Sequence, residues 1–299
     1  MMKLAPGRVV VVLGGLLAVT ATSLAQGPGP GENAYQDMTK TFGFVPSFFR
    51  AFPEEGISAA WDEMKAIEMN PNSTLPPKTK ELIGLAVAAQ IPCHYCSYFH
   101  MRAGKANGAT DEEQKEAIAM AAITRHWSTV ITASQIDMTA FKQEVAKMFQ
   151  HASQQHANGE AEQPITDAAS AYKDLQRTFG FVPTFAKQFP AIGIAPAWRE
   201  AKALEFNPNT ALKAKDKALI GLAVSAQIPC NYCVVFEGES ARQAGATDDE
   251  MKEAVAMAAV TRHWSTVLNG SLIDEAAFRK EVDRIFRTAS EKAPKSAKR

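Results

Sequence analysis

The stretch KTKELIGLAVAAQIPCHYCSYFH, residues 78–100, decides the fold prediction. KTKELIGLAVAAQI, which starts at Lys78, predicts a helix that Pro92 ends. CHYCSYFHMRAGKANG, which starts at Cys93, predicts a second helix that closes at Gly104 or Gly108. Alternating patterns typical of strands are essentially absent from the rest of the chain. We therefore predict an all-α protein.

The same features occur twice along the chain. Three matched positions are Thr41 and Thr178 in TFGFVP, Cys93 and Cys230 in CxxC, and Thr124 and Thr261 in TRHWSTV. Each pair is separated by 137 residues (178 − 41, 230 − 93, 261 − 124), so no insertion divides the copies over that span. A gapless repeat of this length indicates a duplicated domain.

The repeat suggests a division of the chain into five parts. A signal peptide is predicted over residues 1–25 and a first helical domain over 26–155. A polar stretch over 156–170 is typical of a linker, and the second helical domain follows over 171–290. Residues 291–299 form a basic tail.

The composition is that of an ordinary globular protein without a strong overall charge. The chain has 299 residues, of which 46% are hydrophobic and 21% are charged. Lys and Arg together number 32, as do Asp and Glu, so no general field attracts nucleic acid or an anionic membrane. We expect no nucleic-acid partner.

The first residues predict export. Lys3 and Arg8 precede the apolar run VVVVLGGLLAVTA, and small residues follow in SLA before Gln26. This pattern predicts a signal peptide cleaved before Gln26, and the alternative is an uncleaved membrane anchor. We expect a secreted or periplasmic protein with no stable membrane insertion, in a compartment where disulfides persist.

The first CxxC pair has the pattern of a reactive dithiol. A cysteine pair at a helix start is favoured as thiolate by free N–H groups and by the helix dipole. Cys96 and His100 are four residues apart and share a helix face, so His100 can exchange a proton with the Cys96 thiol. Antiparallel packing of the preceding helix would bring Glu81 to His100 and complete a Glu-His-Cys relay.

The arrangement Glu81, Cys93-x-x-Cys96 and His100 resembles the alkylhydroperoxidase D (AhpD-like) proteins of the carboxymuconolactone decarboxylase superfamily. The resemblance covers both repeats and implies two tandem AhpD-like helical domains that form a homotrimer or another homo-oligomer. It also implies reduction of a hydroperoxide substrate, with electrons from a protein or small-molecule dithiol donor. By this resemblance Cys96 attacks the peroxide and Cys93 resolves the product, although the dipole argument alone favours Cys93. No cofactor and no metal are required.

Two departures from the family pattern affect the site. Many members carry a histidine before the second cysteine, where this chain has Tyr95; a phenol, with a pKa near ~10, can bond a thiolate but is a poor proton shuttle at neutral pH. The second repeat keeps Cys230 and Cys233 but has Ala218 and Glu237 where the first repeat has the two relay residues. We predict that the second pair is a structural disulfide or a slow redox pair.

Three other interpretations remain open. The cysteines can be staples in a non-enzymatic helical scaffold, or Cys93, Cys96 and His100 can bind a metal together with Glu81 or His94. A decarboxylase of the carboxymuconolactone type is the third, although such an enzyme needs no dithiol. His126 recurs in the second repeat as His263, which favours a structural role in helix packing.

Overall fold

A computed structural model describes residues 29–154 and 163–292 of the chain. The predicted signal peptide and most of the basic tail lie outside the described residues, as does the first part of the predicted linker. Within the described ranges the protein is built of helices without strands, which confirms the all-α prediction. None of these helices is both long enough and apolar enough to cross a membrane.

The two repeats fold into matching series of helices. The first series is α1 (Glu32–Phe42), the short 3-10 helix η1 (Ser47–Ala51), α2 (Glu54–Ile67), α3 (Pro77–Gln90), α4 (His94–Ala106), α5 (Asp111–Ser134) and α6 (Met138–Gln154). The second is α7 (Ala168–Phe179), α8 (Thr184–Lys187), α9 (Ala191–Leu204), α10 (Ala214–Gln227), α11 (Asn231–Gln243), α12 (Asp248–Gly270) and α13 (Glu275–Lys292). The tandem duplication is therefore present in the structure.

Local sequence signals set the helix ends. The capping box of Thr110 with Glu113 begins α5, and that of Thr247 with Glu250 begins α12. Cys93 itself is the N-cap of α4, because its sulfur accepts a hydrogen bond from the backbone N–H of Cys96. The helix ends thus place the first cysteine where free N–H groups point.

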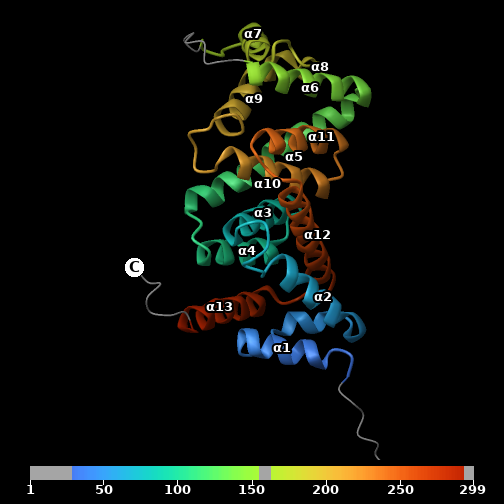
Figure 1. Cartoon of the computed structure of the whole chain (residues 1–299), viewed down its shortest axis with the longest axis vertical. Helices are drawn as coiled ribbons and strands as arrows, with labels where there is room; N and C mark the ends of the chain where they lie inside the picture. Colours follow the sequence, from blue (N-terminus) through green and yellow to red (C-terminus); the bar gives the residue numbers. More distant parts are fainter. Residues whose placement is uncertain (1–28, 155–162, 293–299) are drawn as a thin grey trace, which may run out of the picture.

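The central core is shared by the two repeats. Helices α3 and α10 lie side by side in the middle of the molecule, and α5 and α12 pack against both of them (Figure 1). α3 and α10 are apolar around most of their circumference, which is typical of helices buried on every side. Each repeat therefore completes the core of the other.

The two ends of the molecule are also built from both repeats. The first lobe joins α1, η1, α2 and α4 to the second half of α12 and to α13. The second lobe joins the second half of α5 and α6 to α7, α8, α9 and α11. These lobes occupy opposite ends of the long axis (Figure 1). A site in either lobe can consequently draw side chains from both halves of the sequence.

Candidate active site

The first CxxC pair lies buried where α4 begins. The Cys93 and Cys96 sulfurs are 2.7 Å apart, and both cysteines are free. The Cys93 sulfur also accepts from the Cys96 backbone N–H at 3.2 Å and from Asn269 Nδ2 at 3.4 Å. The two sulfurs are close enough to share a proton and to oxidise together.

The hydrogen bonds divide the charge unequally between the two sulfurs. The thiol of Cys96 lowers the pKa of Cys93 to about 6, against the effect of burial, and Ser265 and Asn269 contribute to the lowering. The hydrogen bond to Cys93, together with burial, raises the pKa of Cys96 well above its usual range. The resting thiolate is therefore on Cys93, the position that the helix-dipole argument favours.

The cavity beside the pair favours the other sulfur for contact with a substrate. Cys96 lines a cavity of about 40 Å³, whereas Cys93 has no exposed surface. The rest of the lining is mainly apolar and aromatic and includes Phe48, Phe49, Phe99, Trp264 and Phe278. The assignment of peroxide attack to Cys96 stays a prediction, and it requires the shared proton to move to Cys93.

The structure brings together the two predicted relay residues. Nδ1 of His100 on α4 lies 2.8 Å from Oε2 of Glu81 on α3, and both side chains are buried. Burial raises the pKa of Glu81 to about 8 and lowers the pKa of His100. We assign a neutral Glu81 carboxyl that donates to Nδ1, because this arrangement buries no net charge.

A glycine makes room for this imidazole. A Cβ atom at Gly84 would lie 2.6 Å from both Nδ1 and Nε2 of His100, closer than side-chain atoms approach. The ring therefore lies flat against the α3 backbone. Gly221 occupies the matching position in α10, where Glu237 takes the place of the imidazole.

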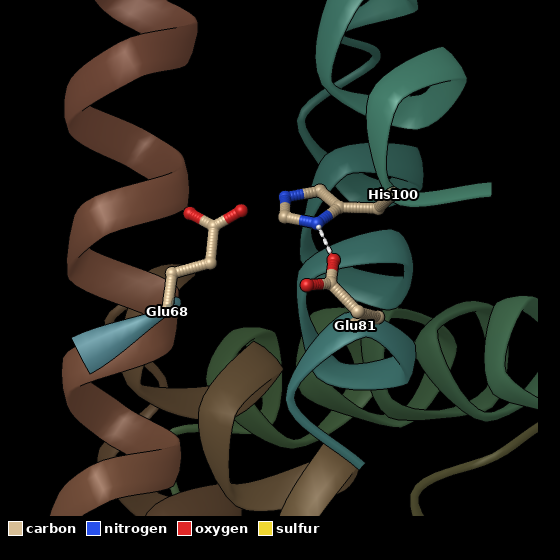
Figure 2. Close-up of side chains that lie close together, drawn as sticks. All are labelled: Glu68, Glu81 and His100. Atoms are coloured by element: carbon tan, nitrogen blue, oxygen red, sulfur yellow. Dashed lines mark hydrogen bonds and ion pairs between the residues drawn. The ribbon is translucent and has the colours of Figure 1, made fainter. Parts of the chain in front are cut away.

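Glu68, which the sequence analysis did not single out, completes the cluster. It caps the C-terminal end of α2 and is 5% exposed. Figure 2 shows its carboxyl group facing the imidazole, and the ligand atoms of Glu68, Glu81 and His100 lie within 4.8 Å of one another. Burial, the largest cause, raises the pKa of Glu68 to about 7. The sequence signal that could have indicated Glu68 is the internal repeat, since IEMNPN over 67–72 recurs as LEFNPN over 204–209.

The second repeat supplies one wall of the first site through α12. Thr261 Oγ1 lies 3.4 Å from His100 Nε2, and its backbone oxygen lies 4.0 Å from the Cys96 sulfur. Ser265 and Asn269, one and two turns further along α12, contact the cysteine pair. The repeated TRHWSTV was the signal for this wall, but no sequence pattern indicated that it belongs to the site of the other repeat.

Tyr95 and His126, which the sequence analysis also considered, make their contacts away from the reactive cluster. The hydroxyl of Tyr95 donates to the backbone oxygen of Ile273 at 2.6 Å, so it is directed to the loop before α13. Tyr232 makes the matching bond to Ile136. His126 is exposed and its ring packs against Trp127 and Phe189. These contacts are those of helix packing.

The second lobe holds a different set of groups around its cysteine pair. Cys230 and Cys233 are joined in a disulfide. A cavity of about 60 Å³ is lined by Cys233, Glu205 and Glu237, with aromatic side chains around them. Burial raises the pKa of Glu205 to about 7, and burial together with Glu205 raises that of Glu237 well above its usual range. Glu237 thus takes the place of His100, while Glu205 corresponds to Glu68.

A metal held by the first cysteine pair does not fit the arrangement. Among the described residues, the acidic and His or Cys groups close enough to hold an ion are Glu68, Glu81 and His100, whose ligand atoms lie within 4.8 Å of one another. Neither sulfur belongs to this set, and His94 is exposed. Because Glu81 already occupies Nδ1 of His100, we assign the three groups to proton handling instead.

Comparison with known proteins identifies the class that this fold and this site define. The model of the carboxymuconolactone decarboxylase family matches residues 55–136 and 194–275, which include both CxxC pairs. The chain belongs to the carboxymuconolactone decarboxylase family, as a tandem duplication of the AhpD-like domain.

A solved structure shares the fold. It is a chain from Burkholderia xenovorans LB400 described as a gamma-carboxymuconolactone decarboxylase subunit, with a TM-score of 0.51 and 15% sequence identity. The match covers 89% of this chain and 98% of that one. At this identity the likeness concerns the fold alone. A comparison with curated proteins gives no significant match.

Proposed function

We propose that the protein is an exported thiol oxidoreductase that reduces hydroperoxides through a dithiol/disulfide cycle of Cys93 and Cys96. The observation that carries the proposal is the pair of free cysteine sulfurs 2.7 Å apart, beside an apolar cavity that Cys96 lines together with His100. A low pKa on one sulfur and a cavity contact on the other are what a peroxide-reducing dithiol requires.

The cycle begins with transfer of the shared proton to Cys93, which leaves the charge on Cys96. The Cys96 thiolate attacks the distal peroxide oxygen, so an S–O bond forms as the O–O bond breaks and the alcohol departs. The Cys93 sulfur then attacks the sulfenic acid, forming the disulfide and releasing water. The Glu81–His100 pair offers a second route for the Cys96 proton. When Glu81 is ionised, the neutral imidazole carries its proton on Nδ1, which donates to the carboxylate, and Nε2 is then an acceptor.

Return of the disulfide to the dithiol needs two electrons from a dithiol donor, either a protein or a small molecule. The second pair is expected to remain a disulfide or to react slowly. We also propose export by the N-terminal segment and assembly into a homo-oligomer. The sequence features described above support these two proposals.

The decarboxylase alternative is disfavoured by the cavities. A decarboxylase must bind a carboxylate, which favours a positive charge in the site. The described residues that line the two cavities beside the cysteine pairs include carboxyl groups and apolar side chains but no Lys or Arg. An uncharged peroxide fits such walls better than a carboxylate does.

Stopped-flow reaction of the pre-reduced protein with an organic hydroperoxide tests the proposal. We expect rapid loss of one dithiol, abolished by Cys96→Ser, slowed by His100→Ala and indifferent to Cys233→Ser. If the unmodified protein and all three variants react at the rate of an ordinary free thiol, the peroxidase proposal fails. The scaffold interpretation of the cysteines would then be preferred.

A further inference from the structure

Glu68 is a buried acid that the proposed cycle does not yet use. Its Oε1 atom is enclosed without a hydrogen-bond partner, and no described residue is found to bond its other oxygen. Burying a carboxyl group without partners is unfavourable. Since the second repeat carries Glu205 at the equivalent position, the acid is a regular part of the repeat, and its free oxygens require an explanation.

The backbone holds this carboxyl at the cavity. Lys80, itself fully buried, donates to the backbone oxygen of Ile67 at 2.9 Å and to that of Asn70 at 2.6 Å. These two bonds fix the chain on either side of Glu68. The carboxyl group then lines the same cavity as Cys96 and His100, and it faces the His100 ring (Figure 2). A molecule that reaches the Cys96 sulfur therefore lies beside Glu68.

The charged groups around Glu68 come from two helices. Lys80 and Glu81 face it from α3, while His100 and Cys96 face it from α4. Burial raises the pKa of Glu68 to about 7, so a substantial share of this carboxyl carries a proton near neutral pH. His100, whose pKa is lowered by burial, holds no extra proton to give. The cavity thus places an acid beside Cys96, the cysteine that the proposed cycle deprotonates.

We propose that Glu68 is the general acid that protonates the departing alkoxide when Cys96 attacks a hydroperoxide. The inference rests on the proposed function. The Cys96 thiolate takes the distal oxygen, the O–O electron pair goes to the proximal oxygen, and that oxygen receives the Glu68 proton. The products are the Cys96 sulfenic acid, an alcohol and the Glu68 carboxylate. When the disulfide then forms, the Cys93 proton leaves with the hydroxide as water, and solvent returns a proton to Glu68.

A change of leaving group tests this role. Ethyl hydroperoxide releases a strongly basic alkoxide, whereas peracetic acid, of similar size, releases acetate, which needs no proton. General acids contribute roughly 100-fold or more to such steps. We expect Glu68→Gln to slow ethyl hydroperoxide reduction by about 100-fold and peracetic acid reduction by less than about threefold. Glu205→Gln, the matched change in the second lobe, should leave both rates unchanged.

The possible outcomes separate the inference from the proposed function. Equal slowing of both substrates by Glu68→Gln would show a structural role, and unchanged rates would show no role; either result overturns the inference while peroxide reduction stands. Reduction of neither substrate by the unmodified protein removes the proposed function and the inference together. Reaction of the variant's dithiol with a small aromatic disulfide, which uses no Glu68 proton, should match that of the unmodified protein and so establish that the variant is folded.

Discussion

At the scale of single residues, the site depends on a glycine as much as on its reactive groups. The His100 ring fits because position 84 has no Cβ, and Gly84→Ala would force the ring away from Glu81. We expect this change to slow peroxide reduction by at least about tenfold, because the relay loses its geometry. Stopped-flow rates measure the effect. Gly221→Ala displaces the Glu237 carboxyl instead and should leave the rate unchanged.

The pKa of Cys93 predicts the acid limb of the pH dependence, that is, the pH below which the thiolate and the reaction rate are lost. Because hydrogen bonds lower this pKa to about 6, the thiolate is present above that pH and is lost as the pH falls through it. Removing one donor with Ser265→Ala weakens the stabilisation of the charged form, so the limb should move to higher pH. The pH dependence of thiolate absorbance in the reduced protein measures the shift. An unchanged or lower midpoint would contradict the assignment of charge to Cys93.

At the scale of helices, the sequence predicted the features that are set by residues close together in the chain. The helix expected from Lys78 is α3, which begins at Pro77, and the helix expected from Cys93 is α4, whose N-cap is Cys93. The Glu81–His100 contact followed from the packing of consecutive helices. Local pattern could not reveal Glu68 or the wall formed by α12, because these contacts join segments that are distant in the chain. The hydrophobic periodicity of a helix is the same whether the helix packs against its own repeat or against the other, so it cannot reveal that helices are exchanged.

The matching helices of the second lobe allow the relay to be tested by introducing a Glu-His pair beside the second cysteine pair. Positions 218 and 237 in α10 and α11 correspond to those of Glu81 and His100, and the glycine that accommodates the ring is present. In a Cys93→Ser/Cys96→Ser background, the combination Ala218→Glu with Glu237→His should accelerate peroxide reaction of the reduced second pair by about tenfold or more. Each single change should do much less, because a lone buried Glu or His lacks its partner.

Stopped-flow rates of the two single variants and the double variant form the measurement. Additive effects of the two changes would show that the residues do not act as a pair. Replacement of Cys233, the counterpart of Cys96, by serine in the double variant is the control, since it should abolish the gain. A gain that survives this control would arise elsewhere in the chain.

At the scale of the whole molecule, buried ion pairs join the two repeats. Lys217 of α10 lies 3.1 Å from Glu116 of α5, and Lys80 of α3 lies 3.7 Å from Glu253 of α12. Each lysine also donates to backbone oxygens, and each glutamate accepts from a backbone N–H of the opposite repeat, at Leu212 and at Leu75. These bonds fix α5 and α12 in the exchanged positions that complete both lobes.

The exchange predicts that loss of one ion pair weakens the molecule as a whole. Glu116→Gln leaves the Lys217 ammonium buried without its carboxylate, which should cost roughly 3–5 kcal/mol of unfolding free energy. Urea unfolding measures the change. Glu116→Leu combined with Lys217→Met removes both charges, so much of the stability should return. Because α5 belongs to both the central core and the second lobe, the first and second lobes should unfold in one transition. Separate transitions, or a loss below about 1 kcal/mol for Glu116→Gln, would show that the exchanged helices are not what holds the repeats together.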